Sequence, residues 1–152
     1  MAALRLAEEW RSIVTERRLV QPLSKIGRVI AFSDAWVPEA VGLEGAFTPV
    51  NKRVDVSLGP VSQTDGCVRR HLAWRAASQA RLFPLMEGSV TAIRASAFDC
   101  IIEVKAHYQP PLGRVGQLAD RALLHLVASA SIERFADEIA VRLDRSAREL
   151  DA

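Results

Sequence analysis

Apolar and polar residues alternate through the middle of the chain with the period of two that is typical of a half-buried β-strand. The alternation is clearest over residues 98–108, where apolar side chains from Phe98 to Tyr108 occupy every second position. The same pattern recurs in three earlier segments, residues 53–58, 67–76 and 82–94. Short connections such as the turn Thr64-Asp65-Gly66 join these segments. They predict an antiparallel meander with one buried face, whose first strand ends at Gly59-Pro60.

The C-terminal segment has the longer period of an amphipathic helix. Residues 114–149 contain no proline, and their only glycine is Gly116 near the start. The apolar stripe consists of Leu118, Ala119, Ala122, Leu123, Leu126, Val127, Ala130, Ile132, Phe135, Ile139 and Leu143. One face of the meander must be covered, so we expect this helix to pack on it. A straight helix of this length would reach roughly 54 Å, so we expect a frayed end or a bend near residues 129–131.

The first third of the chain predicts shorter elements. Residues 3–10 suit a short helix, and residues 11–20 suit either an edge strand or a continuation of that helix, with the strand favoured. Pro22 suits a first helical turn. Helical spacing follows it at Leu23, Ile26, Val29 and Ile30. A second short helix is expected from Ala35 to Val41, ended by Gly42 and Gly45. Together these patterns predict an α+β domain with a curved antiparallel sheet around a long C-terminal helix, and with two short helices near the N-terminus.

Composition is consistent with one folded domain over residues 1–152. Apolar residues make up 49% of the chain and charged residues 25%, which argues against intrinsic disorder. The net charge of +2 gives no reason to expect nucleic acid or an anionic membrane as partner. No apolar run is long enough for a membrane span, and Glu8 and Glu9 stand where a signal peptide needs an apolar core. We therefore expect a cytoplasmic protein.

Residues 83–135 carry the clearest family resemblance. The predicted strand 98–108 runs into Tyr108-Gln109-Pro110-Pro111-Leu112-Gly113, and the helix follows with Leu118-Ala119-Asp120-Arg121-Ala122-Leu123-Leu124-His125 and Ile132-Glu133-Arg134-Phe135. This layout resembles uncharacterised bacterial members of the polyketide cyclase/START-like (SRPBCC) superfamily, which share the helix-grip fold of the birch pollen allergen. The resemblance implies a sheet that curves around the helix and leaves a cavity between them. Members bind lipids, sterols, aromatic polyketides or plant hormones there, and a minority catalyse reactions.

The expected inward-facing side chains define a candidate ligand site: Trp74, Met86, Val90, Cys100, Ile102, Tyr108, Leu123, Leu126 and Val127. Two interpretations stay open, a filled core and a pocket of a few hundred Å³. In a pocket, the hydroxyl of Tyr108 would serve as a polar handle. Arg70 shares the inward register, and it either meets a carboxylate at the cavity rim or lies in solvent at the strand end, with solvent favoured.

Other reactive side chains favour structural interpretations. His71 and His107 fall on the outward register of the sheet, and His125 lies near the polar side of the long helix, so no metal site and no cofactor are expected. Glu87 and Glu103 are expected to form cross-strand ion pairs with Arg75, Arg94 or Lys105. Cys100 reads as a small core residue, and Cys67 stands beside a turn. Asp137, Glu138, Arg142 and Arg145 are expected to be ordinary surface charges of the helix.

The leading functional hypothesis is binding or transport of a small hydrophobic or aromatic molecule in the cytoplasm. One alternative is an aromatase/cyclase-like enzyme, which would need an inward-facing acid or histidine. Another is a protein-interaction module with an exposed apolar patch, for which Trp10 and Trp36 are the residues of interest. An exposed edge strand in the first segment would suit a homodimer.

Overall fold

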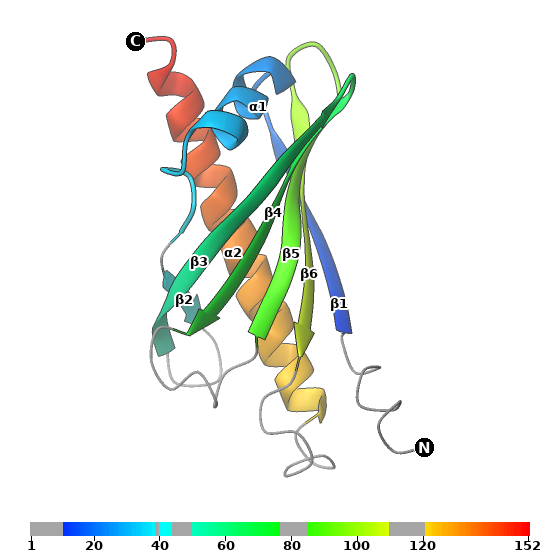
Figure 1. Cartoon of the computed structure of the whole chain (residues 1–152), viewed down its shortest axis with the longest axis vertical. Helices are drawn as coiled ribbons and strands as arrows, with labels where there is room; N and C mark the ends of the chain where they lie inside the picture. The colour runs from blue at the N-terminus through cyan, green and yellow to red at the C-terminus, as the bar shows by residue number, and fades with distance from the viewer. Residues whose placement is uncertain (1–10, 39, 44–49, 77–84, 110–120) are drawn as a thin grey trace.

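A computed structural model describes residues 11–38, 40–43, 50–76, 85–109 and 121–152 of the chain (Figure 1). In chain order its elements are β1 (Arg11–Leu19), α1 (Leu23–Phe32), β2 (Ala40–Leu43), β3 (Val50–Thr64), β4 (Cys67–Ala76), β5 (Leu85–Arg94), β6 (Cys100–Gln109) and α2 (Arg121–Glu149). The strands form one antiparallel sheet in the order β1-β6-β5-β4-β3-β2. The predicted meander is therefore confirmed.

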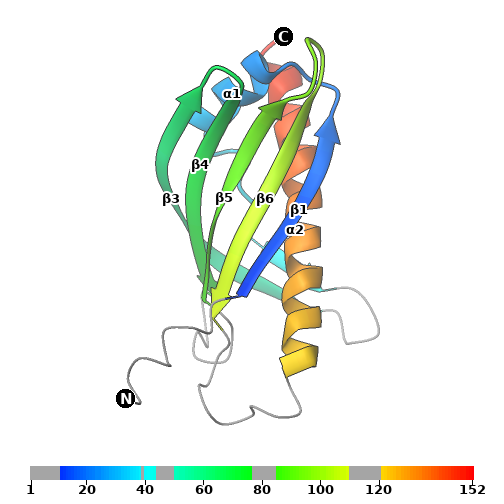
Figure 2. The same ribbon diagram turned by 90° about the vertical axis from the view of Figure 1, so that its right-hand side faces the viewer.

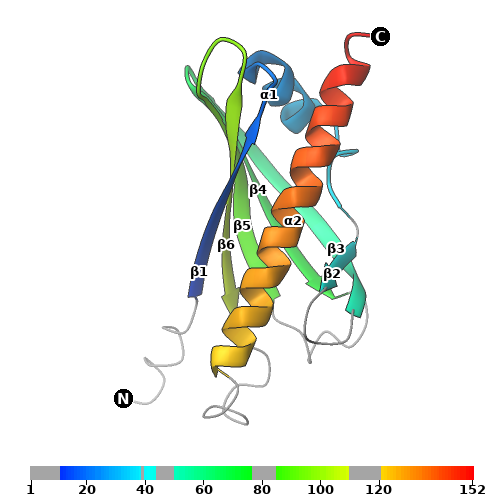
Figure 3. The same cartoon turned by 180° about the vertical axis from the view of Figure 1, so that it is seen from behind.

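The sheet curves around α2, which crosses its inner face, while α1 lies at one end of the same face (Figures 2 and 3). The strand interpretation of residues 11–20 is confirmed, because β1 pairs with β6 from Arg11↔Tyr108 to Leu19↔Cys100. The hairpin prediction is also confirmed, since Thr64 pairs with Cys67 across the turn. The predicted helix over residues 3–10 and the segment 110–120 lie outside the described residues.

Two local predictions were wrong. First, β3 does not end at Gly59-Pro60 but continues to Thr64, with a register shift between Leu58 and Val61. Proline is tolerated there because the shift interrupts the regular hydrogen-bond ladder. Second, the described residues between 35 and 41 form no helix: a turn at residues 35–36 is followed by β2 from Ala40. Pro38 explains this, because the residue before a proline is driven away from helical backbone angles.

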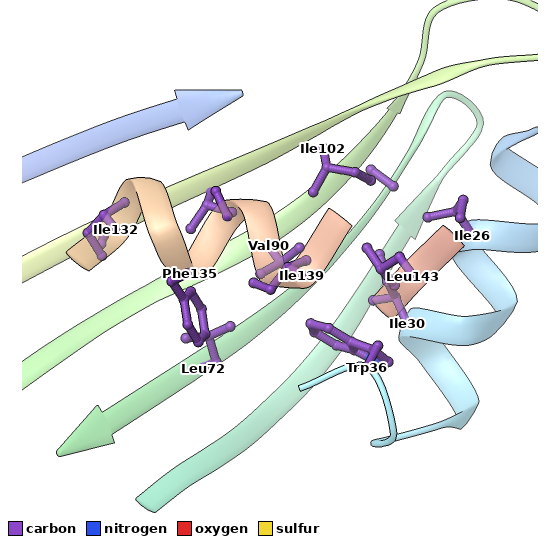
Figure 4. Packing of buried hydrophobic residues seen from close by; sticks show 14 of the residues in the cluster. Ile26, Ile30, Trp36, Leu72, Val90, Ile102, Ile132, Phe135, Ile139 and Leu143 are labelled. Atoms are coloured by element: carbon purple, nitrogen blue, oxygen red, sulfur yellow. The ribbon is translucent and has the colours of Figure 1, made fainter. Parts of the chain in front are cut away.

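The hydrophobic core lies between the inner face of the sheet and one face of α2, and α1 and Trp36 close it at one end (Figure 4). The buried side chains of α2 are Ala128, Ile132, Phe135, Ala136, Ile139, Leu143 and Ala147. Leu126 was expected on this face but is 62% exposed. It precedes Ile132 by six residues, which places it about 120° away around the helix. Phe98 was also expected to face inward, yet it is 78% exposed because β6 begins only at Cys100.

Arg17 of β1 connects the edge of the sheet to α2 through ion pairs and hydrogen bonds. Its guanidinium forms ion pairs with Glu133 and Asp137 and donates a hydrogen bond to the hydroxyl of Thr15. These contacts raise the pKa of Arg17, with the hydrogen bond to Asp137 as the largest cause, and lower the pKa of Glu133. Asp137 is therefore not the simple surface charge that its helical position predicted, because β1 packs beside it.

Candidate functional site

Three large side chains form a row across the inner face of the sheet. The strand register places Trp74 opposite Met86, and Met86 opposite Tyr108. All three are buried, as expected from their alternation. From α2, Phe135 stacks on Trp74 with 4.6 Å between the ring centroids and 24° between the ring planes. The buried row therefore combines aromatic and thioether side chains, and its Trp74 packs against α2.

Other members of the predicted site lie in the buried core. Val90, Cys100 and Ile102 are fully buried. Leu126 points away, as described above, so it does not line the interior. Leu123 and Val127 belong to α2, but their side chains are not among those that the structure describes. Whether any of these residues contacts a ligand stays a prediction.

A hollow of about 520 Å³ opens beside this row, between β3 and the segment that follows α1. We call it the β3-side hollow; it is lined by Asp34, Val37, Val54, Asp55, Val56, Leu58 and Arg70. Within the described residues, β2 pairs with residues 50–53 of β3, and the hollow opens beside the part of β3 that follows them. Val56 pairs with Trp74, and Leu58 pairs with Leu72. The apolar wall of the hollow thus continues directly into the Trp74 row.

Arg70 stands at the polar end of the β3-side hollow, and its side chain is only 14% exposed. Its Nη1 donates hydrogen bonds to the carbonyl oxygen of Ile30 (2.9 Å) and to Oδ1 of Asp34 (3.1 Å). Its Nε donates a longer hydrogen bond, 3.4 Å, to the carbonyl oxygen of Gly59. The favoured prediction, a solvated arginine at the strand end, was wrong. The alternative, an arginine that meets a carboxylate at a rim, describes the observed contact with Asp34.

A second hollow, of about 540 Å³, lies on the outward face of β3, β4, β5 and β6. Its floor includes Ser89, and its wall includes both His71 and His107. The outward register of these histidines is confirmed, and Nδ1 of His107 lies 2.8 Å from the hydroxyl oxygen of Ser12. Within the described residues, no group of three or more histidine, cysteine, aspartate or glutamate side chains is arranged to hold a metal ion.

The predicted ion pairs of Glu87 and Glu103 do not form in the described part of the chain. The strand register explains this, because Glu87 faces Ala73 and His107, whereas Glu103 faces Thr91 and Glu16. Arg94, one of the expected partners, instead donates a hydrogen bond to the carbonyl oxygen of Asp65 (2.9 Å). The two carboxylates are therefore surface charges of the outward face.

The remaining candidates have clear structural roles. Cys100 is fully buried, and burial raises the pKa of its thiol to about 11, so it is held as an unreactive thiol. Trp36, considered for an exposed interaction patch, is fully buried in the core. Its indole Nε1 has no hydrogen-bond partner within the described structure. Trp10 lies outside the described residues.

The sequence pattern did not predict two sets of contacts, the ion pair between Arg70 and Asp34 and the salt bridges of Arg17. Arg70 and Asp34 are separated by 36 positions, and Arg17 and Glu133 by 116 positions. Periodicity places a side chain on a face, but it does not say which distant loop will pass that face. Only the inward register of Arg70 was predictable.

Comparison with known proteins gives a consistent picture of the fold. No protein-family model matches the chain, and no curated protein sequence matches it. Solved structures do match: the Zhui aromatase/cyclase of Streptomyces sp. R1128 has a TM-score of 0.50 at 14% identity, over 95% of this chain and 97% of that one. The chain has the START-like helix-grip fold. The predicted fold class is thereby confirmed.

Two further structures with the helix-grip fold support this assignment. A START superfamily protein of Mycobacterium smegmatis matches with a TM-score of 0.52 at 11% identity, over 88% of this chain and 97% of that one. Truncated norcoclaurine synthase of Thalictrum flavum matches with a TM-score of 0.53 at 10% identity, over 86% and 91%. Identities this low establish the shared fold and not a shared activity. Neither described helix of this helix-grip protein is long and apolar enough to cross a membrane.

Proposed function

We propose that this helix-grip protein binds a small apolar or aromatic molecule, which enters through the β3-side hollow and lies against the Trp74 row. The observation that carries the proposal is the continuity of the two surfaces. Val56 and Leu58 line the hollow and pair directly with Trp74 and Leu72 on the inner face of the sheet. A ligand in the hollow would therefore meet the edge of the aromatic stack formed by Trp74 and Phe135.

The chemistry of these side chains suits such a ligand. Binding would come mainly from burial of apolar surface, at about 25 cal/mol per Å² removed from water. Val54, Val56 and Leu58 present apolar side chains to the hollow, and Met86, in the row behind them, adapts its shape to irregular neighbours. The volume of the hollow, about 520 Å³, suits a small ligand better than a long-chain lipid.

The enzymatic alternative has less support. An acid–base reaction in the interior needs an inward-facing group that can exchange a proton near neutral pH. Among the described residues of the inner face there is no histidine, aspartate or glutamate. Cys100, whose pKa is raised to about 11, offers no nucleophile either. The structural likeness to an aromatase/cyclase therefore supports a shared fold but not a shared reaction.

The proposal is tested by titrating the protein with 1-aminoanthracene, an uncharged aromatic fluorophore whose emission rises in apolar surroundings. Saturable binding at one site per chain is expected. Val56→Phe places a ring in the hollow and should abolish this binding. Val14→Phe is the matched control, because Val14 is exposed on β1, away from the hollow. No saturable binding to the unmodified protein, or equal binding by both variants, would refute the proposal.

A further inference from the structure

The polar end of the β3-side hollow identifies the class of ligand more closely. We infer that the ligand is an organic anion, a carboxylate on an apolar body, and that Arg70 binds its carboxylate in place of Asp34. This inference rests on the proposed function and deepens it. Three features of the hollow support it: the confinement of Arg70, the weak attachment of Asp34, and the distance from Arg70 to the Trp74 row.

Arg70 is a largely buried positive charge with unused hydrogen-bond donors. Two backbone carbonyls, those of Ile30 and Gly59, fix the orientation of the guanidinium. Its Nη2 makes no hydrogen bond within the described residues, so part of the planar fork is free. A buried cation needs a negative partner, and a guanidinium binds a carboxylate best through two parallel hydrogen bonds. The site is thus oriented in advance for a bidentate carboxylate.

Asp34 is a weak occupant of this position. Its side chain is 75% exposed, and it accepts one hydrogen bond of 3.1 Å from Arg70 through a single oxygen. Because Asp34 is exposed, water competes with Arg70 for its carboxylate, and this weakens the ion pair. A ligand carboxylate can therefore replace Asp34 at small cost, and Asp34 then turns to solvent. The other carboxylate of the hollow, Asp55, occupies the outward register opposite Arg75 and does not compete for Arg70.

The dimensions of the site define the ligand further. Arg70 and Trp74 share the inner face of β4 and are separated by four residues, which corresponds to about 13 Å along a strand. Between them the wall is apolar, with Leu72 on β4 and Val56 and Leu58 on β3. A ligand that spans this distance carries its carboxylate at one end and a flat apolar body, such as a fused aromatic ring, at the other.

The inference is tested with a matched pair of ligands, 2-naphthylacetic acid and its methyl ester, each displacing 1-aminoanthracene. The two share the aromatic body and differ only in the negative charge. In the unmodified protein the acid should bind roughly tenfold tighter or more, the range expected for charge-assisted hydrogen bonds. Arg70→Gln should remove this preference, because it should weaken the acid much more than the ester.

Asp34→Asn keeps Arg70 and should change the affinity for the acid in the opposite direction. Removal of the competing carboxylate should increase the affinity for the acid severalfold and change the affinity for the ester much less. Equal affinities of acid and ester in the unmodified protein, with 1-aminoanthracene still bound, would overturn this inference and leave the proposed function standing. If neither the fluorophore nor either naphthyl compound binds, both are overturned. Circular dichroism shows whether each variant is folded. If Arg70→Gln does not fold, Asp34→Asn still tests the inference.

Discussion

Phe135 is the side chain of α2 whose removal should weaken the fold most directly. It is fully buried, and it stacks on Trp74 with 4.6 Å between ring centroids. Phe135→Ala removes a buried ring from the contact between the helix and the sheet, and the packed surroundings can collapse only partly into the space. Truncations of this kind cost about 3–5 kcal/mol, which includes the loss of the aromatic pair.

That loss is a large fraction of the free energy of unfolding of an ordinary domain, about 5–15 kcal/mol. Urea unfolding followed by circular dichroism at 222 nm measures it as a lower midpoint with an unchanged slope. The matched control is Leu126→Ala on the same helix, because Leu126 is 62% exposed. The control should change stability by about 0.5 kcal/mol or less, as surface substitutions usually do.

The pair of variants distinguishes two orientations of α2. The apolar stripe of the sequence contains both Leu126 and Phe135, whereas the structure buries only Phe135. If Leu126→Ala cost as much as Phe135→Ala, the helix would have to be rotated from the orientation described here. A cost below about 1 kcal/mol for Phe135→Ala would show that the stacked contact does not hold helix and sheet together.

Three other changes have clear expected outcomes. Gly88→Ala should lower the free energy of unfolding in urea by about 3 kcal/mol or more. The new Cβ would lie 2.0 Å from the carbonyl oxygen of Lys105. Gly66→Ala is the control and should be tolerated, because the space around Gly66 is open. Glu133 has a lowered folded-state pKa, chiefly through the hydrogen bond from Arg17, so its contribution is present above the ordinary value of 4.5 and is lost as the pH falls below it. Unfolding measured from pH 7 to 3 should therefore depend less on pH in Glu133→Gln than in Glu149→Gln, and equal dependence would contradict the bridge. Cys100 should resist Ellman's reagent at pH 8 in the folded protein while Cys67 reacts, and Cys67→Ser should remove all rapid reaction.

The fold was predictable where a simple period determines the burial of successive residues. The alternation in β4, β5 and β6 set the inward face correctly, and it placed Trp74, Met86 and Tyr108 on it. The helix α2 was predictable as an element, but its orientation was not. Apolar residues cover more of its circumference than the sheet buries, so the prediction that Leu126 faces inward was wrong.

Predictions failed where a local rule competes with pairing to a distant segment. Gly59-Pro60 is a common end for a strand, yet β4 continues past this position and keeps β3 paired on both sides of the register shift. The residues from Ala35 to Val41 have acceptable helical spacing, but Pro38 and the pairing of β2 with β3 override it. In each case the deciding partner lies on another strand, which a window along the chain does not include.

Arg70 shows why the candidate site was only partly predictable. Val68, Leu72 and Trp74 fix the phase of β4, and that phase forces Arg70 to the inner face, where a charge has to be neutralised. Solvent at the strand end would have met this requirement, and so would a carboxylate from any loop. The segment after α1 supplies Asp34, which is exposed and bonded through one oxygen. Because burial fixes the arginine and solvent exposure leaves its partner replaceable, the same packing that neutralises Arg70 also allows a ligand carboxylate to compete for it.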